Sequence, residues 1–219
     1  MTLRFSNRAD AGAMLAAKLA KYSGAPGALV LGLPRGGVPV ADAVARRLGL
    51  PLDVFIVRKL GVPGQEELAM GAIASGGVCS MNEEIVAALH LPASAVASVR
   101  AREQLELERR ERQYRAGRPE LRVAGRTVIL VDDGIATGAT MRAAALALRE
   151  RRAGRVVVGA PVASDTARAD LGAVADDFVA VLQPALFQSV GQWYGDFSQV
   201  TDAEVTALLA AAPADRAEA

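Results

Sequence analysis

One stretch of the chain constrains its fold more than any other: residues 127–140, which read TVILVDDGIATGAT. Residues 128–131 are apolar and rich in β-branched side chains, so they predict a buried β-strand. Two aspartates and a short loop that contains glycine follow, and an alanine-rich run that predicts a helix begins at Met141. Strands that alternate with helices in this way are typical of α/β folds with a parallel sheet.

The same stretch predicts a binding site for an anion. The backbone N–H groups at the start of a helix are unpaired, and the helix dipole adds partial positive charge there. Gly138 allows close approach of the backbone, and the hydroxyls of Thr137 and Thr140 add donors. Asp132 and Asp133 are acceptors, which suit hydroxyl groups or a metal ion beside the anion. The pattern therefore favours a sugar phosphate, and the alternative is an ordinary strand-to-helix turn with solvated carboxylates.

The rest of the chain continues the alternation of strands and helices. Residues 58–68 predict a polar loop, and residues 183–200 predict an irregular segment. We expect an open, mostly parallel α/β sheet flanked by helices in a single domain over residues 1–212, with a helical and hairpin insertion at about 70–120, a small hood at about 183–212 and a disordered tail at 213–219. Helices are predicted at residues 7–22, 38–48, 82–90, 92–116, 141–152, 164–172 and from 201, and strands at 28–33, 52–57, 70–75, 78–81, 128–131, 155–162 and 178–182.

Composition excludes several classes of function. Basic and acidic residues number 25 and 24, so the net charge of +1 predicts no binding to nucleic acid or to a membrane surface. Cys79 is the single cysteine, which excludes an intramolecular disulfide and a cysteine-based zinc site. The absence of a signal-like start and of a long apolar run predicts a soluble, cytoplasmic protein. The Arg- and Glu-rich run at 100–115 predicts a solvated helix face, with a subunit contact as the alternative.

Cations follow the first two predicted strands. Ligands of open α/β sheets collect at the carboxyl ends of strands. Arg35 lies in the segment Leu-Pro-Arg-Gly-Gly at 33–37, where its guanidinium suits phosphate oxygens and the two glycines let backbone amides approach them. Arg58 and Lys59 end the second strand and could offset the charge of an anionic leaving group. The alternatives are a turn with a solvent-facing arginine and a surface turn with incidental charges.

Together, residues 31–37, 58–64 and 128–140 resemble the motifs of the type I phosphoribosyltransferases (PRTases), and most closely those of uncharacterised bacterial members that share approximately the stretches RKLGVPG and WYGDF. The resemblance implies a Rossmann-like core and a signature that binds phosphoribosyl pyrophosphate (PRPP). Residues 136–140 would wrap its 5′-phosphate. The implied catalytic residues are Asp132, Asp133, Arg35 and Lys59, and the implied substrate-binding residues are Pro34, Gly36, Gly37, Arg58, Gly134, Ile135, Ala136, Thr137, Gly138, Ala139, Thr140, Trp193 and Tyr194.

The resemblance also implies a reaction. A PRPP-dependent pentosyltransferase of nucleotide metabolism would transfer the 5-phosphoribosyl group to a nitrogen acceptor, a nucleobase for example, and release pyrophosphate. Mg²⁺ would bind through PRPP, with Asp132 and Asp133 as candidate protein ligands, and the protein would form a homodimer. The family often has a non-proline cis peptide at the bond that precedes Arg35. The alternative is a non-catalytic regulatory protein that binds PRPP or a nucleotide.

Two features bear on the acceptor. Ala136 stands where hypoxanthine-type members carry an acidic residue, so the resemblance does not favour a 6-oxopurine acceptor. Aromatic residues cluster in the predicted hood, where Trp193 or Tyr194 could stack on a base; the alternative is that they pack the last helix onto the sheet.

Overall fold

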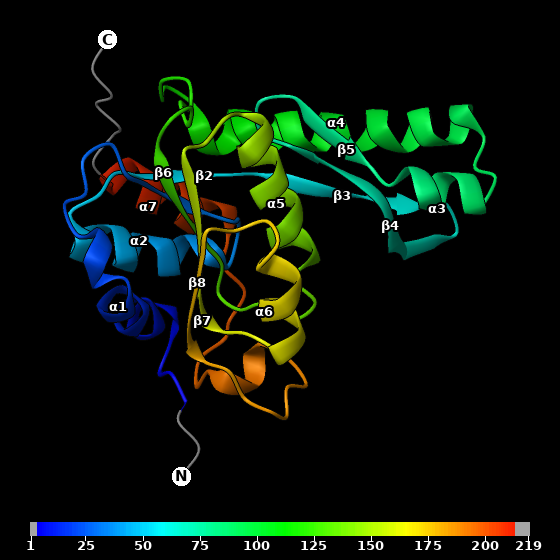
Figure 1. The fold of residues 1–219 in the computed structure, drawn as a ribbon. Coiled ribbons are helices and arrows are strands. Elements are labelled where there is room, and N and C mark those ends of the chain that lie inside the picture. Colours follow the sequence, from blue (N-terminus) through cyan, green and yellow to red (C-terminus); the bar gives the residue numbers. More distant parts are fainter. Residues whose placement is uncertain (1–3, 213–219) are drawn as a thin grey trace.

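A computed structural model describes residues 4–212, and Figure 1 shows their arrangement. The central layer is a parallel sheet of five strands in the order β2-β1-β6-β7-β8. These strands are β1 (Leu29–Gly32), β2 (Leu52–Val54), β6 (Thr127–Val131), β7 (Arg155–Val162) and β8 (Asp177–Leu182). The predicted open, mostly parallel sheet is thus confirmed. The tail predicted at 213–219 lies outside the described residues.

Helices cover both faces of this sheet because its strands carry apolar side chains on both sides. Ile129 and Val131 of β6 join a core formed with α1, α2 and α7, whereas Val128 and Leu130 join a second core formed with α5 and α6. The helices are α1 (Arg8–Lys18), α2 (Gly37–Leu48), α5 (Ala139–Glu150), α6 (Asp165–Leu171) and α7 (Asp202–Ala211).

Side-chain caps begin three of these helices, and Ser164 caps α6 by accepting a hydrogen bond from the Ala167 N–H. The Asn7 side chain accepts a hydrogen bond from the Asp10 N–H and caps α1. Thr201 and Glu204 exchange side-chain and backbone hydrogen bonds in a capping box that begins α7.

In the sequence, a second sheet and two helices stand between β2 and β6. Strands β3 (Val57–Val62), β4 (Gln65–Ala74) and β5 (Val78–Met81) form an antiparallel sheet, followed by α3 (Glu83–Ala88) and α4 (Ala93–Arg115). In Figure 1 this sheet extends away from the central sheet, with α4 along it and α3 at its far end. We refer to it as the insertion sheet.

The prediction of a polar loop at 58–68 is wrong. These residues belong to β3 and β4, which pair with register shifts on either side of Gly61 and leave a turn at Pro63 and Gly64. The second strand also ends at Val54, and the insertion begins at Val57. The alternating pattern of a two-faced strand explains the error: Leu60 is buried, Lys59 is exposed, and glycine and proline nearby suggested a loop.

Helix α4 is not exposed to solvent on every face. Its exposed face carries ion pairs within the helix, such as that between Arg109 and Glu106, as the charge run predicts. A narrow stripe of Val99, Glu103, Leu107 and Tyr114 is buried against the protein. The buried Glu103 is the exception to the prediction of a solvated charge run.

Candidate active site

The predicted anion loop surrounds a cavity at the carboxyl end of β6. The cavity has a volume of about 200 Å³ and lies at the N-terminus of α5. Gly138 precedes the helix with φ = 75°, a conformation that favours glycine. Val190 of the predicted hood covers the loop so closely that a Cβ on Gly134 would lie 2.3 Å from its Cγ1. The lining residues are Asp132, Gly134, Ile135, Ala136, Thr137, Gly138, Ala139, Thr140, Met141 and Val190.

The two carboxylates that follow β6 have different surroundings. Asp132 lines the cavity, and its Oδ1 accepts a hydrogen bond of 2.8 Å from the Asp133 N–H. Burial, together with the charge of Asp133, raises the pKa of Asp132 well above its ordinary value of 3.8. Burial also raises the pKa of Asp133, although the hydrogen bond from Arg8 opposes this rise. The pair is a buried concentration of negative charge, which the hydroxyl donors of a ligand or a cation would stabilise.

Arg8, the first residue of α1, holds Asp133 in place. Its Nε and Nη2 each lie 2.8 Å from Asp133 Oδ2. Its Nη1 donates to the Ser198 carbonyl at 2.8 Å, and its guanidinium lies 4.0 Å from the centre of the Phe197 ring. Arg8 is not among the residues predicted from the sequence, because no local pattern links it to an aspartate 125 residues away.

The predicted glycine loop at 34–37 packs directly against the acidic pair. A Cβ on Gly36 would lie 2.0 Å from Asp133 Oδ2, and a Cβ on Gly37 would lie 2.7 Å from the Val131 carbonyl oxygen. A side chain at position 37 would therefore clash with backbone, and one at position 36 would displace the Asp133 carboxylate. The peptide bond between Pro34 and Arg35 is cis, which confirms the prediction for this bond. The structure thus brings together the two loops that the sequence predicts in one site.

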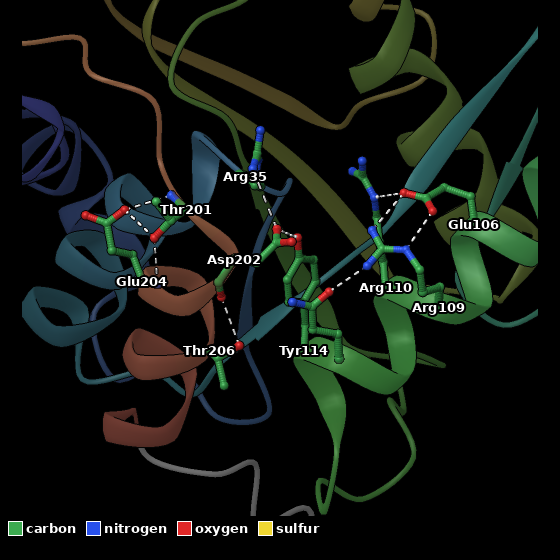
Figure 2. Close-up of polar contacts among 10 residues, drawn as sticks. Arg35, Glu106, Arg109, Arg110, Tyr114, Thr201, Asp202, Glu204 and Thr206 are labelled. Carbon is green, nitrogen blue, oxygen red and sulfur yellow. Dashed lines mark hydrogen bonds and ion pairs between the residues drawn. The ribbon is translucent and has the colours of Figure 1, made fainter.

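Arg35 faces α7 and α4, as Figure 2 shows. Its Nη1 lies 3.8 Å from Asp202 Oδ1, and the same oxygen accepts a hydrogen bond of 2.5 Å from the Tyr114 hydroxyl. Burial, aided by this hydrogen bond, raises the pKa of Tyr114 to about 12, so the hydroxyl stays protonated. The hydrogen bond from Tyr114, with the charge of Arg35, lowers the pKa of Asp202. Asp202 is thus an ionised acceptor beside Arg35.

The structure does not bring Arg58 and Lys59 together. They are consecutive in β3, so their side chains point to opposite faces of the insertion sheet. Arg58 Nη2 lies 2.6 Å from Oε2 of the buried Glu103. Lys59 instead lines a second cavity, of about 570 Å³, together with Thr140. The two cations therefore do not face the same group.

Among the aromatic residues of the predicted hood, Tyr194 packs inward, whereas Phe197 is exposed. Tyr194 is 2% exposed, and its ring centre lies 5.3 Å from that of Phe5 and 5.0 Å from that of Phe197. Its hydroxyl donates to the Asp133 carbonyl at 2.5 Å. Trp193 is half-buried in the same cluster. In this conformation Tyr194 supports the acidic pair from behind and presents no open ring face for stacking.

Asp132 and Asp133 are also the candidate protein ligands for Mg²⁺. Within residues 4–212, with the Glu67 side chain left aside, no group of three or more His, Cys, Asp and Glu side chains is arranged to hold a metal ion. The acidic pair is compatible with Mg²⁺, which binds through one or two carboxylates when substrate phosphates supply further oxygens.

In the same described part of the chain, no helix is both long enough and apolar enough to cross a membrane.

The fold and this loop arrangement define an α/β protein of the Rossmann-like class, in which a strand-to-helix loop faces an acidic pair. The chain belongs to the phosphoribosyl transferase family, because the model of the phosphoribosyl transferase domain matches residues 3–179. The family resemblance seen in the sequence is thus confirmed.

Two protein sequences from strains of Mycobacterium tuberculosis, provisionally named as phosphoribosyl transferases, are 48% identical to it over 215 residues. That alignment covers 98% of this chain and 48% of each relative, so the chain spans about half the length of the curated relatives it matches. The protein TT1426 from Thermus thermophilus is 46% identical in sequence to this chain. Its crystal structure superposes with a TM-score of 0.84, and the alignment covers 94% of this chain and 98% of that one.

Proposed function

We propose that this domain transfers the 5-phosphoribosyl group of PRPP to a nitrogen acceptor of the nucleobase class and releases pyrophosphate. The observation that carries the proposal is that the glycine loop at 34–37 and the loop before α5 lie together in one site. The cavity at the start of α5 offers backbone donors for a phosphate, and the glycine loop at 34–37 packs against the aspartates that line or support that cavity.

Residues 136–140 would hold the 5′-phosphate of PRPP. The helix dipole of α5 and the hydroxyls of Thr137 and Thr140 favour an anion at this end of the cavity. Asp132 lines the same cavity and would accept hydrogen bonds from the ribose hydroxyls. Asp133 would hold the second hydroxyl, with Arg8 fixing the orientation of its carboxylate.

The pyrophosphate of PRPP would lie against the glycine loop. Backbone amides of Gly36 and Gly37 and the guanidinium of Arg35 would donate to its oxygens. Arg35 would exchange its contact with Asp202 for the ligand, and the 3.8 Å separation of that pair makes the exchange easy. We do not assign Lys59 and Arg58 to the pyrophosphate, because Lys59 lines the second cavity and Arg58 is paired with Glu103.

The proposed reaction depends on how the protein positions the two substrates and places charges beside them, and it needs no covalent bond to the protein. The bond between C1 of the ribose and the pyrophosphate oxygen breaks with its electron pair on the oxygen, and the nitrogen lone pair of the acceptor forms the new bond to C1. The proton of the acceptor nitrogen passes to the released pyrophosphate or to water. Asp132 and Asp133 place negative charge beside the developing cation. Mg²⁺, held by PRPP with Asp132 as a protein ligand, would neutralise charge on the pyrophosphate. Ala136 offers no carboxylate for the acceptor proton, so we do not expect a 6-oxopurine as the acceptor.

The proposal includes, from the family resemblance, a homodimer that works in nucleotide metabolism in the cytoplasm. A sedimentation experiment would decide the oligomeric state.

The test is Mg²⁺-dependent release of pyrophosphate from PRPP across a panel of nucleobases. We expect release with one acceptor, and loss of release in Asp132→Asn with the fold retained. The matched control is Asp170→Asn, which changes an exposed aspartate on α6 and should leave release unchanged. Binding of PRPP without release for any acceptor would favour the regulatory alternative, and no binding of PRPP would refute the proposal.

A further inference from the structure

The second cavity lies between the insertion sheet and α5. Its volume of about 570 Å³ is within the range of roughly 300–1,000 Å³ typical of small-molecule sites. Its walls come from β3, β4, β5, the first turn of α3 and the first two turns of α5. Ala139 and Thr140 line both this cavity and the smaller one that faces Asp132, so the two are neighbours.

Small side chains keep this cavity open. Ala69 and Ala72 line it from β4, and Ala139 and Ala143 line it from α5. Leucine or phenylalanine at these positions would extend into the space between the sheet and the helix. Val57, Met81 and Leu146 supply the remaining apolar surface. The middle of the cavity therefore suits a flat, largely apolar group.

The charged lining residues come from three elements. Arg142 lies on α5, and Lys59 lies on β3 in register with Ala72 of β4. Glu83 and Glu84, in the first turn of α3, supply acceptors. In Figure 1, α5 lies against the near end of the insertion sheet and α3 lies at its far end. The lining thus offers cations to an anionic group and carboxylate acceptors to N–H donors.

We propose that this cavity binds a nucleoside monophosphate. A phosphate monoester carries about −1.5 to −2 charges at pH 7, which matches the two cations Lys59 and Arg142. The ring of the base would lie on the alanine-lined surface. Exocyclic and ring N–H groups of the base would donate to Glu83 and Glu84.

The nucleotide would be a second ligand and not the acceptor. This step rests on the proposed function, which places the 5′-phosphate of PRPP at Ala139 and Thr140 and the ribose at Asp132. The second cavity borders the phosphate end. A group bound there is separated from C1 by the phosphate and the ribose, so it could not attack C1.

The experiment titrates the 219-residue chain with AMP, GMP, CMP and UMP, and with inorganic phosphate, by calorimetry. We expect at least one nucleotide to bind with a Kd below about 1 mM and more tightly than phosphate. Arg142→Gln should weaken that binding about tenfold, because it removes a charge-assisted contact to the phosphate. Arg47→Gln is the matched control, since Arg47 is exposed on α2 and lies outside the cavity.

A second variant tests the shape of the cavity. Ala143→Leu should fill it and weaken nucleotide binding at least tenfold, and binding of the nucleotide should persist in the presence of saturating ribose 5-phosphate. The absence of any nucleotide that binds with a Kd below about 1 mM, equal affinity in wild type, Arg142→Gln and Ala143→Leu, or displacement by ribose 5-phosphate would each overturn the inference. If Ala143→Leu does not fold, the Arg142→Gln result decides, because Arg142 is exposed. Failure of PRPP to bind the wild-type chain would refute the proposed function, while the Arg142 result would still decide this one.

Discussion

Replacing Arg8 with methionine should destabilise the protein, because Arg8 is the ion-pair partner of a buried carboxylate. The side chains of Arg8 and Asp133 are 11% and 14% exposed, and their N–O distance is 2.8 Å. Removal of one partner from a fully buried pair costs about 3–5 kcal/mol. The remaining exposure of this pair lowers the expected loss to about 2–4 kcal/mol. At about 2–4 °C per kcal/mol for a chain of this length, Tm should fall by about 4–16 °C.

The loss should depend on pH in a definite direction. Without Arg8, the pKa of Asp133 in the folded state rises further above its unfolded value, because the hydrogen bond and charge that oppose the rise are gone. The folded variant then holds a proton that the unfolded chain releases, so its stability falls as pH rises from about 4 through the folded pKa. The deficit relative to wild type should therefore be small at about pH 4 and complete at about pH 7.5.

Denaturant unfolding of wild type, Arg8→Met, Asp133→Asn and the double variant at both pH values measures this pair. The double variant removes both charges, so its loss should be smaller than the sum of the single losses by about 1–3 kcal/mol. Arg47→Met, which changes an exposed arginine on α2, should alter stability by less than about 0.5 kcal/mol. Additive losses, or a deficit that is the same at both pH values, would refute the assigned role of Arg8.

Three further perturbations test other parts of the site. Asp132→Asn should abolish PRPP binding. It should also stabilise the free protein at about pH 7.5, because asparagine cannot ionise. The raised pKa of Asp132 makes the stability of the wild type fall as pH rises above 3.8. Unfolding curves measured from about pH 4 to about pH 8 check this, and identical pH dependence in the two proteins would contradict it. Tyr114→Phe should raise the pKa of Asp202 and lower stability by about 1–2 kcal/mol, because the hydrogen bond from the Tyr114 hydroxyl is the largest cause of the low pKa of Asp202. An NMR titration in which the pKa of the Asp202 carboxyl does not change would count against this prediction. Glu103→Gln should leave the charge of Arg58 uncompensated and lower stability by about 1–2 kcal/mol in thermal unfolding, and an unchanged Tm would show that the pair is not stabilising.

Much of the fold follows from local patterns in the sequence. The apolar run before Asp132 predicts the central strand, and Thr201 predicts the start of α7, because strand burial and helix capping depend on residues a few positions apart. The prediction for 58–68 is wrong because glycine and proline hide the alternation of Leu60 and Val62. Pairing between the consecutive strands β3 and β4 makes that segment a hairpin.

Of the candidate site, the sequence by itself predicts the strand-to-helix loop after Asp133 and the glycine loop at 34–37, because each is a contiguous motif, and the family resemblance implies the cis bond before Arg35. Only the tertiary structure decided which charges meet. Arg8 reaches Asp133 across 125 residues, and consecutive Arg58 and Lys59 separate to opposite faces of one strand. Side-chain partners are set by how elements pack in space, and that information is spread over the whole chain.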